Sequence, residues 1–367
     1  MSDRVCGPKQ QGHREMETVL TRLDRNAARG GADWHFPAER RTLSMVELRD
    51  RSLRLATVMR DCGVTGGARV ALMMNTSSHY VLALLALWRL GATAVPLPAP
   101  GPRPKHHAEY IRRCDAACSF QLMLCDDTVT GATCSPLFTN RFHARIKDLI
   151  KAAAHAPAQP VQAAGKAAHG AVLQCSQDSS GKLSCVSVSH SMMMVRLEHI
   201  SRTHRKARRG RPVESLASWL PFDHDMGLFC GVLMPLFTGC RNLLVSPACY
   251  RQQPLHWFAQ MSARRVDMHI TTPSALAAAL AVLGRLRPSA STMELSRLHL
   301  YLYADKASPP VLRHCYRVLE PLGFKREHLH AGFGVAENAV EDNRPPRPGR
   351  RPLPEVTARP PIAGRLS

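Results

Sequence analysis

The first strongly patterned stretch, residues 68–98, constrains the fold more than any other part of the chain. After the Gly66-Gly67 turn, Ala68–Met74 is apolar apart from Arg69, which predicts a buried strand. Ser77–Gly91 then has the length and composition of a buried helix that ends at a glycine. Ala92–Pro98 predicts the next strand. A strand, a helix and a strand within about thirty residues form a βαβ unit, which implies a parallel sheet with helices on its faces.

The same alternation extends in both directions. Before the unit, residues 45–63 predict a helix with Leu48, Leu55, Met59 and Cys62 near one face. After it, we expect helices over 108–117, 191–203 and 231–237, strands over 120–125, 171–174 and 242–245, and further strand-helix alternation to about residue 340. The segment after 174 is rich in serine and predicts a loop.

These patterns divide the chain into three parts. Residues 1–39 are mostly polar, with a short helix expected near Thr18, and residues 40–340 form one α/β domain. Residues 341–367 are dominated by proline and arginine and predict a flexible tail.

Charge and composition limit the classes of function. The net charge of +21 is concentrated partly in two basic segments expected to be flexible, Arg202–Arg211 and the tail from Arg344. This charge leaves a nucleic-acid binder as a weaker alternative, because aromatic residues make up only 5% and do not interleave with the basic runs. No apolar run reaches a membrane span, and residues 1–14 lack the apolar region of a signal peptide, so we expect a cytoplasmic protein.

Twelve cysteines are scattered along the chain. The closest are Cys114 and Cys118, and no matching pair with the spacing of a zinc site accompanies them. Several others, such as Cys230, lie inside apolar stretches where a thiol acts as a small hydrophobe. We therefore expect all twelve to be reduced and no zinc site.

Three segments have the composition of a functional site. Residues 171–190 place a loop rich in serine and glycine after a strand, which suits phosphate binding or is an ordinary polar loop. Residues 218–240 place His224 between two aspartates within an apolar run, which indicates a pocket or a surface turn. In residues 330–340, Glu337 follows two glycines, which suits a Mg²⁺ ligand beside phosphates or the opening of a helix. A serine hydrolase is excluded because no GxSxG motif occurs.

The order and spacing of these segments resemble the adenylate-forming superfamily, which includes acyl-CoA synthetases and peptide-synthetase adenylation domains. The opening region from Leu43 to Leu97 is similar to that of the superfamily. Two stretches resemble fatty acyl-AMP ligases in particular: AVPLPAPGPRP, and SWLPFDHDMGL with its His-Asp-Met-Gly run. The resemblance covers Leu43–Val340.

The resemblance implies a fold and a set of site residues. The fold is that of the N-terminal domain of an adenylate-forming enzyme, with stacked mixed and parallel sheets flanked by helices. Nucleotide binding is implied for Ser176, Ser179, Ser180, Gly181, Ala304, Asp305, Phe333 and Gly334. The acyl pocket is implied at His224, Asp225, Met226 and Gly227, and the Mg²⁺ ligand at Glu337.

The chain departs from the family pattern in its phosphate loop. Asp178 stands where the first glycine belongs, and Leu183, Ser184 and Cys185 replace the proline, the lysine and the last glycine. A carboxylate near phosphates opposes binding electrostatically, whereas Lys182 lies two positions early and is a candidate for compensation. Phe333 and the run from Tyr303 to Lys306 also differ from the family's tyrosine and its Gly-Ala-Glu-Pro type of motif. The family's C-terminal domain, with the adenylation lysine, is expected to be missing.

The resemblance implies ATP-dependent activation of a fatty-acid carboxylate as an acyl adenylate, with ATP and Mg²⁺. Given the departures, we expect this activity to be impaired or dependent on a partner. The partners implied are a fatty acid, an acyl carrier protein or a polyketide or peptide synthase, and a separate C-terminal ligase domain. The alternative is a non-catalytic acyl- or nucleotide-binding remnant.

Overall fold

The computed structural model describes residues 17–100, 104–127, 142–158, 170–177, 180–303 and 307–333, and every structural statement below refers to these residues. The expected βαβ unit is present as β3 (Arg69–Met73), α3 (Ser78–Arg89) and β4 (Thr93–Leu97). The strands pair in parallel, and the Ser77 hydroxyl caps α3 by accepting a hydrogen bond from the Tyr80 N–H at 3.1 Å.

This unit lies within a six-stranded sheet of order β6-β5-β3-β4-β7-β8. Its other strands are β5 (Leu122–Cys125), β6 (Phe142–Arg145), β7 (Gly170–Gln177) and β8 (Leu183–Ser189). Only the β7–β8 pair is antiparallel. The serine-rich segment is therefore shorter as a loop than expected, because β8 takes residues 183–189 into a hairpin.

A seven-stranded sheet has the order β13-β12-β11-β9-β10-β1-β2. Its strands are β1 (Trp34–Phe36), β2 (Arg41–Leu43), β9 (Ser215–Ser218), β10 (Arg241–Leu244), β11 (Met268–Thr271), β12 (His299–Tyr303) and β13 (Leu329–Phe333). All neighbours pair in parallel except β1 and β2. This arrangement confirms the α/β class. Each of the two sheets is parallel except for one antiparallel pair, and helices cover their faces.

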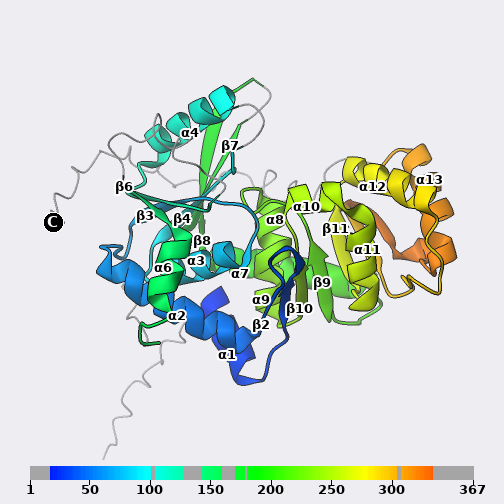
Figure 1. Cartoon of the computed structure of the whole chain (residues 1–367), viewed down its shortest axis with the longest axis horizontal. Helices are drawn as coiled ribbons and strands as arrows, with labels where there is room; N and C mark the ends of the chain where they lie inside the picture. Colours follow the sequence, from blue (N-terminus) through cyan, green and yellow to red (C-terminus); the bar gives the residue numbers. More distant parts are fainter. Residues whose placement is uncertain are drawn as a thin grey trace, which may run out of the picture.

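Helices flank both sheets. They are α1 (Val19–Ala28), α2 (Met45–Asp61), α3, α4 (Pro104–Cys118), α6 (Ile146–Ala153), α7 (His190–Ala207), α8 (Asp225–Leu228), α9 (Met234–Thr238), α10 (Pro247–Gln252), α11 (Pro254–Ala263), α12 (Pro273–Leu286) and α13 (Pro309–Leu319). Short 3₁₀ turns cover Pro37–Glu39, Glu320–Leu322 and Arg326–His328, and a π-helical turn, Phe229–Leu233, joins α8 to α9. Figure 1 shows α8 and α9 between the six-stranded sheet at one end and α11–α13 at the other. No described helix is long and apolar enough to cross a membrane.

The expected domain boundary at residue 40 differs from the structure. Strand β1 pairs with β10 and β2, and Trp34 is fully buried. Helix α1 also packs into the core through Leu23, and its Asp24 forms an ion pair with the buried Arg89 of α3 at 2.8 Å. The folded unit thus includes residues before 40, which the polar composition of this segment concealed. The expected tail, 341–367, lies outside the described residues.

The expectation that the basic segment Arg202–Arg211 is flexible is also wrong. Helix α7 continues to Ala207, so the first half of this segment is helical. Arg208 is buried and forms an ion pair with the buried Asp267 at 2.8 Å. The run of arginines in the sequence gave no indication of which positions in this segment are buried.

The core has two parts. A large cluster of buried side chains connects both sheets and most helices. A second, smaller cluster lies between α4 and the six-stranded sheet, and it includes Ile111, Phe120 and Met123. The β7–β8 hairpin contributes Cys175 to this second cluster, with Cys185 packed against it.

Candidate functional site

Adjacent parallel strands of the seven-stranded sheet end where the predicted motifs begin. Tyr303 ends β12 and Phe333 ends β13, and these two residues are register partners. The sequence following each strand carries predicted nucleotide contacts. Ligands of open α/β sheets bind at the carboxyl ends of the strands. The predicted residues Ala304, Asp305 and Gly334, and the predicted Mg²⁺ ligand Glu337, follow in the chain but lie outside the described residues, as does the side chain of Phe333.

Asp225 is the most strongly connected of the predicted acyl-pocket residues. Its Oδ2 accepts a hydrogen bond from Nη2 of Arg196 on α7 at 2.9 Å. Its Oδ1 accepts from the Tyr303 hydroxyl at 3.3 Å and from the Met226 N–H at 2.6 Å, and it lies 3.1 Å from Nδ1 of His224. The carboxylate therefore joins α7, α8 and the end of β12 and holds His224 in place.

The same contacts set the charges of this cluster. Burial alone would raise the pKa of Asp225, but hydrogen bonds from His224 and Arg196 hold that pKa well below its usual range. The hydrogen bond to Asp225 in turn raises the pKa of His224. The His224 side chain is 52% exposed, and its ring meets that of Tyr303 edge to face at a centroid distance of 5.5 Å. The His224 ring is therefore held by Asp225 and is partly exposed to solvent.

Met226 and Gly227 face the protein interior. Met226 is 2% exposed. A Cβ on Gly227 would lie 1.9 Å from the carbonyl oxygen of Pro221 and 2.9 Å from that of Leu220. The turn that carries His224 and Asp225 can therefore close only if residue 227 has no side chain.

The β7–β8 hairpin carries the predicted phosphate contacts. Ser176 pairs with Ser184 across the hairpin, and both side chains are exposed. Gly181 has a φ of +83°, which suits glycine, and its carbonyl oxygen accepts hydrogen bonds from Arg113 Nη2 and Gln177 Nε2, both at 2.8 Å. The base of the loop is thus tied to α4. Ser180 is also exposed, whereas Ser179 lies outside the described residues.

The hairpin and the seven-stranded sheet meet near these residues. Gln174 Nε2 of β7 donates to the carbonyl oxygen of Asp223 at 3.4 Å. Beside this contact, the Tyr80 ring of α3 meets Phe222 edge to face at 5.1 Å. The structure therefore brings the first two predicted segments together through residues that are 49 positions apart in the sequence.

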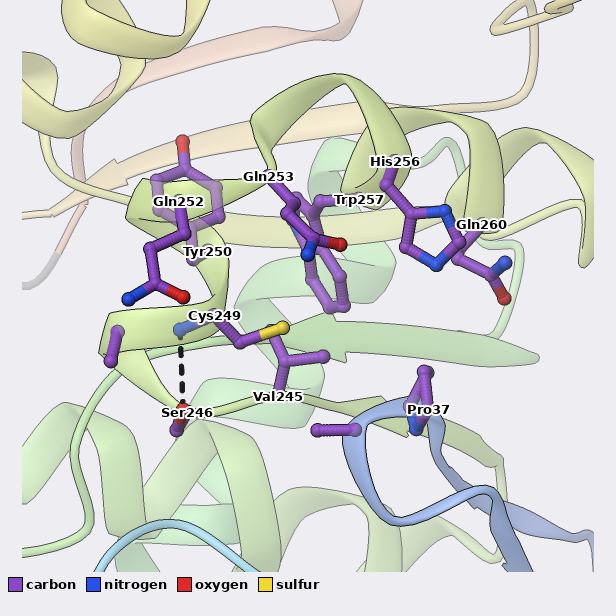
Figure 2. A pocket seen from close by; sticks show the side chains of 12 residues that line it. Pro37, Val245, Ser246, Cys249, Tyr250, Gln252, Gln253, His256, Trp257 and Gln260 are labelled. Carbon is purple, nitrogen blue, oxygen red and sulfur yellow. Dashed lines mark hydrogen bonds between the residues drawn. The ribbon is translucent and has the colours of Figure 1, made fainter.

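The described residues also form a cavity of about 370 Å³ at the end of β10 (Figure 2). It lies between the loop after β1, with Pro37, and the helices α10 and α11, with Gln253, His256 and Trp257. None of the predicted acyl-pocket residues lines it. The cavity is therefore distinct from the cluster around Asp225.

Two features of the site region were not anticipated. Arg196, the partner of Asp225, lies on α7 and belongs to no motif that the sequence displays. The second is a cluster of thiols, because β7 and β8 bring Cys175 and Cys185 to Cys118. Linear spacing gave no signal of this cluster, which depends on the register of the hairpin.

Comparison with known proteins bears directly on this arrangement. The family model of AMP-binding enzymes matches residues 23–364. A putative fatty-acid–CoA ligase, FadD21 of Mycobacterium tuberculosis, is 28% identical over 313 residues, which are 83% of this chain and 52% of that protein. The long-chain-fatty-acid–AMP ligase FadD28 of the same species is 27% identical over 248 residues, 62% of this chain and 39% of that protein. This chain therefore spans about half the length of the curated relatives it matches.

Solved structures show the same fold. A structure from a study of fatty acyl-adenylate ligases of E. coli and L. pneumophila superposes with a TM-score of 0.74 at 22% identity, covering 86% of this chain and 57% of that one. The L. pneumophila ligase in complex with acyl adenylate and pyrophosphate gives a TM-score of 0.71 at 18% identity, covering 87% and 55%. With the extent of the family match, these findings establish that the chain belongs to the AMP-binding enzyme family, with the N-terminal fold of adenylate-forming enzymes, and is homologous to fatty-acid CoA and AMP ligases.

Proposed function

We propose that the chain takes part in ATP-dependent activation of a fatty-acid carboxylate as an acyl adenylate, with impaired or partner-dependent turnover. The observation that carries the proposal is the meeting of the β7–β8 hairpin with the carboxyl end of β9 through Gln174 and Asp223. This contact supports the proposal, because it joins the hairpin that carries the serines to the segment after β9, and nucleotides bind at the carboxyl ends of strands in open α/β sheets.

The residues present fit an adenylate in part. Ser176 and Ser180 are exposed hydroxyl donors suited to phosphate oxygens, and His224 is an exposed, well-oriented polar ring. Ser184, exposed opposite Ser176, supplies no positive charge where the family has a lysine. Glu337 is the candidate ligand of Mg²⁺. Bound Mg²⁺ would stabilise the negative charge of the phosphates.

The chain's own residues would orient the substrates. Arg196 and Tyr303 hold Asp225, and Asp225 holds His224 at the proposed acyl-binding position. Catalysis of adenylation is mainly positioning and charge neutralisation. The adenylation lysine of the family lies in its C-terminal domain, which would complete the site, and the product would pass to an acyl carrier protein or a polyketide or peptide synthase.

Ligand-dependent thermal unfolding tests this proposal. A non-hydrolysable fatty acyl-adenylate analogue at 100 times its Kd should add about 2.7 kcal/mol of stability and raise the unfolding midpoint. His224→Ala should reduce the shift, whereas His199→Ala, at an exposed position of α7, should not. No shift in a chain that unfolds cooperatively would contradict adenylate binding.

The departures in the phosphate loop favour a second candidate, a binding protein that does not turn over. Both candidates predict the thermal shift, so product formation separates them. Acyl-AMP formed from ATP and a fatty acid, with an added C-terminal ligase domain, would support the enzyme. Binding of the analogue with no acyl-AMP under these conditions would support the non-catalytic remnant.

A further inference from the structure

Four cysteines from three elements meet beneath the β7–β8 hairpin. Cys114 and Cys118 are four residues apart on α4 and therefore lie on one face of the helix. Cys175 of β7 and Cys185 of β8 are register partners across the antiparallel pair. The helix face and the strand pair converge in the smaller of the two hydrophobic cores.

Three of the four sulfur atoms already lie close together. Sγ of Cys118 lies 3.2 Å from Sγ of Cys175 and 3.7 Å from Sγ of Cys185, and the last two are 2.8 Å apart. Cys114 lies one helical turn from Cys118 but outside the group of three sulfur atoms that lie within 4.8 Å of one another, so its side chain would have to turn toward them to supply a fourth ligand. Sulfur ligands about 2.3 Å from a tetrahedral zinc ion are about 3.8 Å apart, so a small expansion of this cluster would admit the ion.

The surroundings are those of a structural metal site. Cys114 and Cys118 are fully buried, Cys175 is 6% exposed and Cys185 is partly exposed, so solvent can reach the cluster only from the side of Cys185. Nearby, Arg69 Nη1 donates to the carbonyl oxygen of Cys118 at 2.6 Å. Structural zinc sites are closed and use four protein ligands, and thiolates select soft or borderline ions. A neighbouring guanidinium offsets part of the negative charge that thiolate ligands bring.

We propose that Cys114, Cys118, Cys175 and Cys185 form a tetrathiolate site for one zinc ion that fastens the base of the hairpin to α4. Each thiol loses its proton to solvent as it binds the metal. The ion adds to two existing ties between the same elements: the Tyr110 hydroxyl donates to the carbonyl oxygen of Cys175 at 3.1 Å, and Arg113 holds Gly181. The site is thus placed to set the position of the loop that carries Ser176 and Ser180.

Metal content and cobalt substitution test the site. The full chain, purified under reducing conditions with zinc present, should hold one zinc ion that survives dialysis. Replacement by Co²⁺ should give the visible bands of tetrahedral cobalt and the near-ultraviolet charge-transfer bands of cobalt thiolates. Cys118→Ser and Cys185→Ser should lose tight binding and these bands, whereas Cys315→Ser, which removes a buried thiol in α13, should keep both.

Alkylation followed by mass spectrometry provides a readout that does not depend on how well the serine variants fold. In the native wild-type chain, zinc should protect the partly exposed Cys185, and a chelator should make this thiol available for labelling. Absence of bound zinc, binding retained by both cluster variants, or protection unaffected by the chelator would each overturn the proposal. A mass two hydrogens lower, mapped to a Cys175–Cys185 disulfide in the reduced preparation, would also overturn it.

Discussion

Single side chains decide whether the turn after β9 can form. Asp225 makes contacts to three elements, and Gly227 lets the backbone pass within contact distance of Pro221. From the sequence, these residues were identified only through the family's His-Asp-Met-Gly run. Glycine is required at position 227 because a side chain would clash with the backbone, and aspartate is required at position 225 because of its hydrogen bonds. Neither requirement can be recognised from the composition.

Gly227→Ala should destabilise the fold by more than about 3 kcal/mol, because the added Cβ meets backbone atoms that cannot move cheaply. Urea unfolding followed by circular dichroism measures the change. Gly284→Ala in α12 is the matched control, since its Cβ would meet only side chains at 3.4 Å or more. That change should stabilise by about 0.5–1 kcal/mol. Equal effects of the two substitutions would contradict the steric explanation.

Ser184→Lys, combined with Asp178→Gly, should strengthen ATP binding. The lysine would stand beside Ser176 on the exposed face of the hairpin, where a charge-assisted contact to phosphate is worth about 1.5–3 kcal/mol, or roughly tenfold or more in Kd. Titration calorimetry provides the measurement. Val186→Lys with Asp178→Gly adds the same charge farther along β8, at a position 53% exposed, and should give a smaller gain. No gain in either variant would mean that the loop does not limit binding.

Among the elements, the strands buried on both faces were the easiest to predict. The βαβ unit was expected within a residue or two because continuous apolar runs leave few alternatives. The β7–β8 hairpin was not, because serines occupy three of the seven positions of β8, and the side chains that pack against the cores, Leu183, Cys185 and Val188, are only partly buried. Helix α2 shows the same limit: Leu48, Leu55 and Met59 are buried as expected, but Cys62 is exposed beyond the helix end.

Strand β11 should make stability sensitive to acid. His269 is fully buried, and burial lowers its pKa from 6.5 to about 4. Between these values the unfolded chain binds more protons than the native one, so the free energy of unfolding should fall as pH falls, by up to about 1.4 kcal/mol per pH unit. His269→Asn, which can still donate to the Ala217 carbonyl oxygen, should flatten this slope in urea titrations from pH 7 to 4.

His199→Asn is the control for this slope, because His199 is exposed on α7 and should leave the pH dependence unchanged. An unaltered slope in His269→Asn would show that other buried histidines dominate. The candidates are other histidines whose pKa burial lowers to about 4, His190 and His330, or to about 3, His204 and His299.

For the whole molecule, the fold class and its family were predictable, whereas the boundary and the assembly of the site were not. Motif order was sufficient to identify the superfamily, because three segments recur at the expected spacing. The boundary was set too late because β1 is only three residues long and its pairing with β10 is distant in sequence. The cysteine cluster likewise depends on contacts between segments about sixty residues apart.

Trp34→Ala should destabilise the whole domain by about 3–5 kcal/mol, because this side chain is fully buried in the main core. Fluorescence and circular dichroism should report a single unfolding transition shifted to lower urea. Leu286→Ala, at a position 57% exposed, should change stability by less than about 0.5 kcal/mol. An unchanged midpoint for Trp34→Ala would restore the boundary at residue 40.

The small size of the second core has a kinetic consequence. The hairpin β7–β8 lies at the edge of its sheet and packs against α4 through few apolar side chains. Such a unit can open while the remainder of the molecule stays folded. Backbone amides of the hairpin should therefore exchange with deuterium sooner than those of β9–β12. Occupancy of the loop by a nucleotide should then slow exchange in these two strands more than in the rest of the molecule.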